Sequence, residues 1–447
     1  MTITTLWKYL FGNRQAILDM AGCRQSIWVG FLFVLSAALA REYDGADLWH
    51  EPWHLALPLA ASLVTSFLLF LLVSVVARIR GCTVGPFAAR YRSFLGLYWM
   101  TAPLAWWYAI PVERFLAPAS ATAANLWLLA LVSLWRVGLM TRVIAVLFNA
   151  RAWPSFFVVM FFADTVALVI LRLTPLPIFQ LMGGIRLSPS EQTIQATAFL
   201  VGFIGIISWP VWLIGLIVIS GRRRGEWKPE FANRPATMVR PSLWGLAGGS
   251  LAGWILVLPL TQPEQRLKWR VERDLRNGRL QGAVVVLVSH ERSDFPPHWD
   301  PPPRLGYGET HPRAKDVLKA LAGAEIRPWV TALFSEKFAN ETRTTVYEDI
   351  YGPFSEHLSD DELDEYLAIL EHLPERSQVV REHDTAFERE CQNELRSPAI
   401  RGRIRVLYQE AGFESPDRTT TQRPAISNAP GDSDPEMDRS DPNAEPR

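Results

Sequence analysis

Cysteine is scarce in this chain of 447 residues, which contains three. Cys23, Cys82 and Cys391 are far apart and odd in number, so they predict neither a disulfide framework nor a paired-cysteine metal site. The sequence also lacks a Gly-x-Ser-x-Gly nucleophile elbow and a phosphate-binding loop. We therefore expect no catalytic residues of these classes, no cofactor and no nucleic-acid partner. Whether the chain is an enzyme stays open, with a non-enzymatic role favoured.

A net charge is also missing, because the Lys and Arg residues equal the Asp and Glu residues in number. The balance hides a split: residues 1–261 carry 20 basic against 10 acidic residues, and residues 262–447 carry 25 against 35. The chain is rich in aromatic residues, with 18 Trp and 23 Phe, and such rings gather at membrane interfaces. We expect the basic part in a lipid bilayer and the acidic part in water.

Long apolar runs support this division. A bilayer core of about 30 Å needs roughly 20 apolar residues in a helix. We predict an all-α fold, a polytopic helical membrane protein with about seven transmembrane helices in residues 25–261 and a mainly helical soluble domain in residues 262–411. The predicted helices are 25–40, 55–77, 94–110, 122–147, 155–173, 194–220 and 243–260.

The N-terminal 24 residues read as an amphipathic segment on the cytoplasmic membrane surface. The small residues at 36–40 are typical of a signal-peptidase site, so a cleaved signal peptide is the alternative for the first helix. The region before that helix is long for the charged start of a signal peptide, which favours a retained helix.

Orientation follows from the Lys and Arg residues of the short loops, which favour the cytoplasmic side. Basic-rich and basic-poor loops alternate along the chain, beginning with a basic N-terminus. The N-terminus is therefore predicted to be cytoplasmic, and seven crossings place the C-terminal domain outside the cytoplasm. A basic cluster directly after the last helix points the other way, and acidic neighbours dilute it: Arg266, Lys268, Arg270, Arg273, Arg276 and Arg279.

Two charges fall near the middle of predicted membrane helices, where ionisable residues are costly and usually functional. Arg136 and Asp164 belong to neighbouring helices joined by a short turn. Counted from that turn, their depths are ~18 Å and ~15 Å at the helical rise per residue. We expect an ion pair that locks the two helices. The alternative is a coupling site in a transporter or channel.

Gly245, Gly249 and Gly253 recur every four residues in the last predicted membrane helix. Such a stripe lets another helix backbone approach closely. We expect packing within the chain, and a homodimer face is the alternative.

Residues 50–54 read His-Glu-Pro-Trp-His and match the H-E-x-x-H pattern of zinc proteases. The pattern requires both histidines on one helical face, and Pro52 inside that turn opposes a helix. We expect Pro52 to open the second membrane helix, with Trp49 and Trp53 at the interface. A loose metal site is the weaker alternative, with Asp44, Asp47, His50 and His54 as its ligands.

A capping-box sequence at 261–264 predicts the start of a helix, and we expect the C-terminal part after it to be mainly helical. Residues 294–303 are rich in proline and predict an extended spacer. Residues 412–447 contain almost no aliphatic side chains and predict a disordered tail.

The run Arg-Glu-Tyr-Asp-Gly-Ala-Asp-Leu at 41–48, followed by Glu-Pro-Trp-His-Leu at 51–55, resembles a segment of uncharacterised bacterial polytopic membrane proteins. Residues 294–303 resemble their C-terminal half. The resemblance implies a multi-pass membrane protein and brings no functional residues.

Three functions are compatible with these features. The favoured one is a non-enzymatic membrane scaffold or interaction protein, whose partners are the bilayer and a protein or envelope component bound by the C-terminal domain. A transporter or channel using Arg136 and Asp164 is the second. A metal-dependent membrane enzyme using His50 and His54 is the third.

Overall fold

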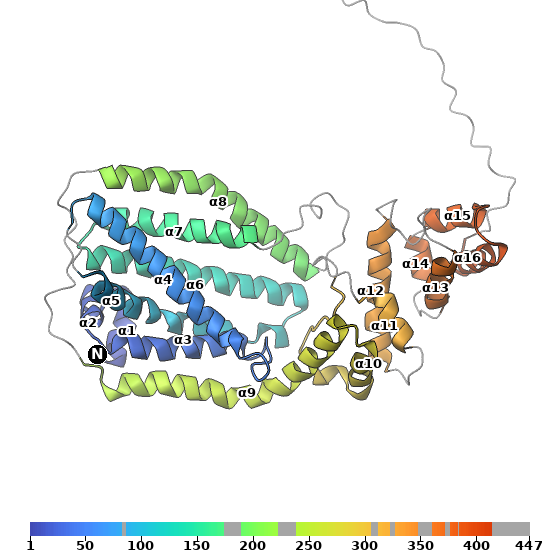
Figure 1. The fold of residues 1–447 in the computed structure, drawn as a ribbon, viewed down its shortest axis with the longest axis horizontal. Helices are drawn as coiled ribbons and strands as arrows, with labels where there is room; N and C mark the ends of the chain where they lie inside the picture. Colours follow the sequence, from blue (N-terminus) through green and yellow to red (C-terminus); the bar gives the residue numbers. More distant parts are fainter. Residues whose placement is uncertain are drawn as a thin grey trace, which may run out of the picture. The chain divides into compact units, whose positions relative to one another are not determined.

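All regular elements of the described residues are helices in the computed structural model (Figure 1), which confirms the all-helical class. The described residues are 1–82, 86–173, 189–221, 238–304, 312–321, 327–346, 360–371, 376–382 and 384–413. The chain divides into two compact units, Met1–Gly352 and Pro353–Arg447, which are considered one at a time. The predicted soluble domain, 262–411, therefore belongs to both units.

The first unit begins with a helical bundle. Five of its helices are long and apolar enough to cross a membrane, and a sixth span is counted if α2 and α3, which meet at a bend of 106°, form one broken crossing. Most of the bundle helices run alongside one another in Figure 1. The helices of the bundle are α1 (Ile3–Leu10), α2 (Arg14–Ala21), α3 (Ser26–Glu42), α4 (Trp53–Ile79), α5 (Phe87–Trp99), α6 (Pro118–Leu147), α7 (Ala152–Leu173), α8 (Pro189–Gly221) and α9 (Pro241–Arg276).

The third predicted membrane helix is divided into two elements. Helix α5 ends at Trp99, and a 3-10 helix, η1 (Ala102–Ala109), continues the chain. Pro103 lies at the start of η1 and has no N–H to donate to the preceding turn, which explains the interruption. A shorter 3-10 helix, η2 (Val112–Arg114), leads into α6.

Helix α3 is central in the bundle, because it packs against α4, α5, η1 and α9. Two glycines permit its close approach to α5. A Cβ atom on Gly30 would lie 2.8 Å from the Cβ atom of Trp99, and one on Gly96 would lie 2.6 Å from Ser26 Oγ. Val29 and Phe33 are fully buried. This central position favours a retained helix over a cleaved signal peptide.

The N-terminal helices α1 and α2 both pack against the bundle through one face. The fully buried Tyr9 donates its hydroxyl hydrogen bond to Leu97 O at 2.7 Å, and Trp135 Nε1 donates to Leu10 O at 2.9 Å. Ile17 and Met20 are also fully buried. Helix α5 is short, with 13 residues, and α1 and α2 pack beside it and α6.

The two ends of the bundle carry different charges. At one end, contacts join the N-terminal region to the start of α9 and to the α6–α7 turn, as in the bonds from Met1 N to Met238 O and from Arg14 Nη2 to Asn149 Oδ1. The basic-rich loops of the described chain lie at this end. The opposite end holds residues 43–52 and 110–117, where Tyr43 donates to Ala109 O. Two further predicted loops, 174–188 and 222–237, lie outside the described residues.

Helix α9 extends past the predicted end of the last membrane helix. It continues for 36 residues through Pro259 and Pro263, so no separate helix begins at Thr261. The predicted capping box does not form. Instead, the Thr261 hydroxyl donates to Tyr43 O at 2.5 Å, outside the helix. A tertiary contact has replaced the local one.

Beyond α9, three helices and the proline-rich segment enclose a separate core. The elements are α10 (Leu280–Ser289), η4 (Arg292–Asp294), α11 (Ala314–Leu321) and α12 (Pro328–Val346). Phe295 and Trp299 stack with ring centroids 4.6 Å apart and are buried together with Leu287 and Phe334. Residues 294–303, which predict an extended spacer, thus contribute side chains to this core.

The second unit contains α13 (Asp360–Glu371), α14 (Arg376–Glu382), α15 (Asp384–Gln392) and α16 (Pro398–Glu410). Arg403 makes two bonds to the Glu371 carboxylate, at 2.8 and 2.9 Å, and joins α16 to α13. The buried Arg396 bonds Glu390 at 2.9 Å. The predicted disordered tail from residue 414 onward lies outside the described residues.

Candidate functional site

The loop between α3 and α4, residues 43–52, is the first component of the site and is called the acidic loop here. Asp47 is buried and shapes its turn: one carboxylate oxygen accepts from the backbone N–H groups of Trp49 at 3.1 Å and His50 at 3.4 Å. The other oxygen bonds His50 Nδ1. Helix α4 then begins at Trp53 with Pro52 at the N-cap, as the sequence predicts.

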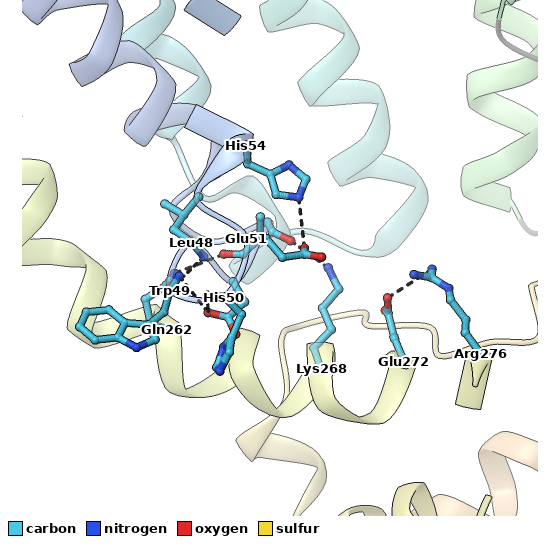
Figure 2. Close-up of polar contacts among 12 residues, drawn as sticks. Leu48, Trp49, His50, Glu51, His54, Gln262, Lys268, Glu272 and Arg276 are labelled. Atoms are coloured by element: carbon cyan, nitrogen blue, oxygen red, sulfur yellow. Dashed lines mark hydrogen bonds and ion pairs between the residues drawn. The ribbon is translucent and has the colours of Figure 1, made fainter. Parts of the chain in front are cut away.

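Helix α9 holds the acidic loop by its backbone. Gln262 donates to Tyr43 O and Ala46 O at 3.2 and 3.3 Å and accepts from Leu48 N at 2.9 Å. Lys268 Nζ donates to Gly45 O at 2.8 Å. Figure 2 shows Gln262 and Lys268 extending from α9 toward the loop. We call the α9 side chains that bond the loop carbonyls the loop clamp; they are Thr261, Gln262, Gln265 and Lys268.

The loop clamp was not found by sequence reasoning. Its spacing places the side chains on successive turns of one helical face, a pattern that also fits an ordinary solvated face. The loop clamp bonds backbone carbonyls of an irregular loop. Every residue has such a carbonyl, so the sequence does not indicate which ones accept these bonds. The consequence is that a loop without regular secondary structure has its polar groups satisfied by a neighbouring helix.

His50 and His54 have separate partners. The His50 ring stacks on Trp269 with centroids 4.4 Å apart, and His54 Nε2 lies 3.2 Å from Glu51 Oε2. Figure 2 shows the two imidazoles pointing in different directions. Among the described residues, no three His, Cys, Asp or Glu side chains are grouped to hold a metal ion. Because Pro52 caps α4, the one-face arrangement of a zinc protease does not form.

A cavity of about 560 Å³ adjoins the acidic loop and is called the charged cavity. One wall comes from α3, the acidic loop, η1, η2 and α6, and the other from α9 and the proline-rich segment. Its polar and aromatic lining residues are Arg41, Asp44, Tyr108, Glu113, Arg114, Asn125, Lys268, His298, Trp299, Asp300 and Arg304.

The cations and anions of the charged cavity are unequally neutralised. Arg114 forms an ion pair with Glu264 at 2.8 Å, and Arg304 forms one with Glu272 at 2.6 Å. Asp300 pairs with Lys337. In contrast, no ion pair with a described residue neutralises Asp44 or Glu113; Glu113 accepts a hydrogen bond from the Asn125 amide.

This environment changes the pKa of the Asp44 carboxyl group. Burial first, and then the negative charge of Glu113, raise its pKa from 3.8 to about 6, against smaller lowering by a backbone hydrogen bond, the Tyr43 hydroxyl and Arg114. Desolvation and a like charge both disfavour the ionised form. The charged cavity therefore presents two neighbouring carboxyl groups that form no ion pair with a described residue.

Arg136 and Asp164 are not brought together. The Asp164 carboxylate accepts from the Ser208 hydroxyl of α8 at 2.7 Å, whereas the Arg136 guanidinium lies over the Tyr98 ring of α5, 5.2 Å from its centroid. The expected ion pair is absent from the described residues. Matched depth brings two side chains together only if both face the shared interface, and here each faces a different neighbouring helix.

The glycine stripe of α9 is also placed differently from the expectation. A Cβ atom added to Gly245, Gly249 or Gly253 would meet nothing within 4 Å, so no described element of this chain packs closely on them. The glycines at close contacts lie elsewhere. A Cβ atom on Gly205 would lie 2.9 Å from Asp164 Oδ1, and one on Gly215 would overlap the Phe157 ring.

The site thus combines a helix-held loop with a charged cavity, and it supplies carboxylates, cations and aromatic rings without a grouped nucleophile and base. Such a set can bind a charged molecule. Comparisons with protein-family models, with curated proteins and with solved structures find no match for this chain.

Proposed function

We propose that this chain is a multi-pass membrane protein that holds a helical domain beyond the bilayer and presents it to a protein or envelope partner. The seven crossings are α3, α4, α5 with η1, and α6 to α9. The domain consists of α10 to α12 and the proline-rich segment, which share one core. Two further matters support the proposal, the length of the divided crossing and the distribution of charge.

The divided third crossing is long enough to span a bilayer. The 13 residues of α5 rise roughly 20 Å, and the 8 residues of η1 rise roughly 16 Å in the steeper 3-10 geometry. Their sum exceeds the hydrocarbon thickness of about 30 Å. Polar groups freed at the break are sheltered, since the buried Thr101 hydroxyl donates to Tyr98 O at 2.7 Å.

The charge of the two bundle ends supports an orientation. The basic-rich end, which includes Arg78, Arg142 and Arg151, is proposed to face the cytoplasm. The acidic loop and the domain after α9 are then on the extracytoplasmic side. Glu272 forms ion pairs with Arg276 and Arg304, which neutralise part of the positive charge at the end of α9. The basic cluster there is therefore a weaker argument for a cytoplasmic position of the domain.

The observation that carries the proposal is the continuity of α9 together with the loop clamp. A domain on a flexible linker would take many positions, whereas α9 passes unbroken from the bundle into the domain and is bonded to the acidic loop on the way. Ordering a binding surface before the partner arrives lowers the entropic cost of association. This arrangement suits a protein that presents a surface.

Site-specific photocrosslinking in the full-length protein in living cells tests this function. A photoreactive residue replaces Ala332 or Glu336, which are exposed on one face of α12, and Arg151 at the other end of the bundle is the control. We expect one discrete adduct from both α12 positions and none from Arg151. The adduct should diminish when the loop clamp is weakened by Q262A with insertion retained. Adducts equal at all three positions, or none, would overturn the proposal.

A transport function is the second candidate, because one observation favours it. Asp164 lies within the apolar helix α7 and bonds Ser208, two residues before Pro210, which lies inside α8. Ionisable residues within membrane helices often mark a transport path. If Asp164 couples transport, Asp164→Asn abolishes solute or proton flux in proteoliposomes while Ser208→Ala only reduces it. Equal flux in all three proteins excludes this role.

A further inference from the structure

We propose that the charged cavity binds a small zwitterion, a molecule with an ammonium group and a phosphate or carboxylate group. The ammonium group lies between Asp44 and Glu113, and the anionic group lies toward Lys268 and Arg41. This binding site goes beyond the presentation of a domain and does not depend on it.

The dimensions of the cavity suit a small molecule. Its volume, about 560 Å³, falls within the range of roughly 300–1,000 Å³ that is common for ligand sites. Its lining is mixed, with charged groups beside Tyr108, Trp299 and Leu129. A ligand with ionic ends and a short carbon chain matches such a lining.

The two carboxyl groups define the cationic end of the ligand. Asp44 and Glu113 both line the cavity and have no ion-pair partner among the described residues, while their mutual repulsion is felt at Asp44. An ammonium group between them would remove that repulsion and donate hydrogen bonds to both. The neighbouring Tyr108 ring adds an aromatic face, a surface that attracts cations.

The anionic end is defined by Lys268. Its ammonium group has three donors, and the structure shows one of them used, on Gly45 O at 2.8 Å. Arg41 lines the same cavity; its Nε atom lies 3.4 Å from the Glu42 carboxylate, and its side chain is 63% accessible, so the rest of the guanidinium can reach a ligand. Arg114 and Arg304 are already engaged by Glu264 and Glu272, so they contribute less to a ligand.

Simpler ligands fit less well. An inorganic anion at Lys268 would leave the two carboxyl groups without a counter-charge. A metal ion would find no group of three His, Cys, Asp or Glu ligands among the described residues. A plain amine would satisfy the carboxyl groups and leave the cations of the other wall unused.

Two sources can supply this chemistry, a free solute and the headgroup of a lipid. Leu129 of α6 lines the cavity and is 49% exposed, so the cavity extends along the apolar surface of a membrane helix. The experiment therefore needs one arm for each source.

The soluble arm titrates O-phosphoethanolamine into the full-length protein in nanodiscs of phosphatidylglycerol, which has no amino group, and follows heat. We expect saturable binding that Asp44→Asn and Glu113→Gln each weaken at least tenfold. Glu388→Gln is the control for the loss of one carboxylate, because Glu388 is an exposed residue of α15 outside the cavity lining, and it should change affinity less than twofold. The N-acetylated probe, which lacks the ammonium group, should not bind, and this control needs no variant to fold.

The lipid arm purifies the same proteins from mixed phosphatidylethanolamine and phosphatidylglycerol membranes and identifies retained lipid by native mass spectrometry. Retention of phosphatidylethanolamine by the unmodified protein and its loss from the D44N/E113Q variant supports the lipid source. Binding in either arm that depends on both carboxyl groups supports the proposal. It is overturned if neither arm shows binding, or if inorganic phosphate, ethanolamine or the acetylated probe binds as tightly as the zwitterion.

Discussion

Lys268 of helix α9 donates a hydrogen bond to the carbonyl oxygen of Gly45 at 2.8 Å, although 223 positions separate the two residues in the sequence. This bond is the last of the loop clamp, and Lys268 also lines the charged cavity. One side chain therefore helps to fix the acidic loop and to form the wall of a possible binding site. A change at this position affects both, so the two roles must be tested at other residues.

Removing the central member of the loop clamp should destabilise the protein. Gln262→Ala deletes three hydrogen bonds and leaves Leu48 N without its partner, at a cost of about 1–3 kcal/mol. Thermal unfolding in detergent measures the loss. Gln281→Ala is the matched control, because that side chain is exposed, and it should stay within about 0.5 kcal/mol. Equal stability of both variants would show that the clamp contributes nothing.

Two glycine substitutions should have opposite effects. Gly30→Ala places a methyl group 2.8 Å from Trp99 Cβ and should destabilise the bundle by about 1–3 kcal/mol. Gly249→Ala meets nothing within 4 Å and should be neutral or stabilising, since alanine favours a helix. Unfolding of the two variants in the same detergent compares them. A destabilised Gly249→Ala would reveal a partner on that face, including a second copy of the chain.

Asp44 should make stability depend on pH. Its pKa is about 6 in the folded chain and 3.8 ordinarily, so the folded state binds more protons between these values. Stability from this group is therefore highest at pH 4 and is lost as the pH rises through about 6. Solvent screening limits the effect to about 1 kcal/mol.

The measurement is thermal unfolding from pH 4.5 to 7.5 for the unmodified protein and for Asp44→Asn. The groups that act on Asp44 are Tyr43, Glu113 and Arg114, and Lys268 and Arg41 line the same cavity. We expect Asp44→Asn to gain stability over the unmodified protein above pH 6 and to lose this advantage near pH 4.5. Parallel pH profiles would contradict the placement of Asp44.

The proposed orientation predicts which cysteines are labelled in intact cells. In a chain with its three cysteines replaced, Trp49→Cys lies in the acidic loop, at a side chain that is 78% exposed. Arg151→Cys lies at the basic-rich end and is also exposed. A membrane-impermeant maleimide should label Trp49→Cys in intact cells and Arg151→Cys only after permeabilisation. The reverse pattern would invert the topology.

Several elements were predictable from single residues and from periodicity. The apolar runs of α4, α6, α7 and α8 are long, so backbone hydrogen bonding in a bilayer leaves a helix as the available structure. Pro52 at the start of α4 followed from its missing N–H. The grouping of basic-rich loops at one end follows from the alternation of loops along the chain.

Other features could not be predicted from the sequence, because they depend on how the helices pack. The rotation of Arg136 and Asp164 about their helix axes, which directs them to different partners, was not encoded in any count of residues. The capping-box sequence at Thr261 was overridden because the acidic loop offers carbonyls to that side chain. The carboxyl pair of the charged cavity joins Asp44 with Glu113, whose chain separation hides their proximity.

The uninterrupted course of α9 has a mechanical consequence. Its 36 residues form a rod of roughly 54 Å, anchored near Met1 at one end and to the acidic loop farther along. Pro259 and Pro263 lie between these two anchors, and each removes a backbone hydrogen-bond donor from the helix. The helix therefore bends most easily at these turns, between its start at Pro241 and the surface that carries Lys268.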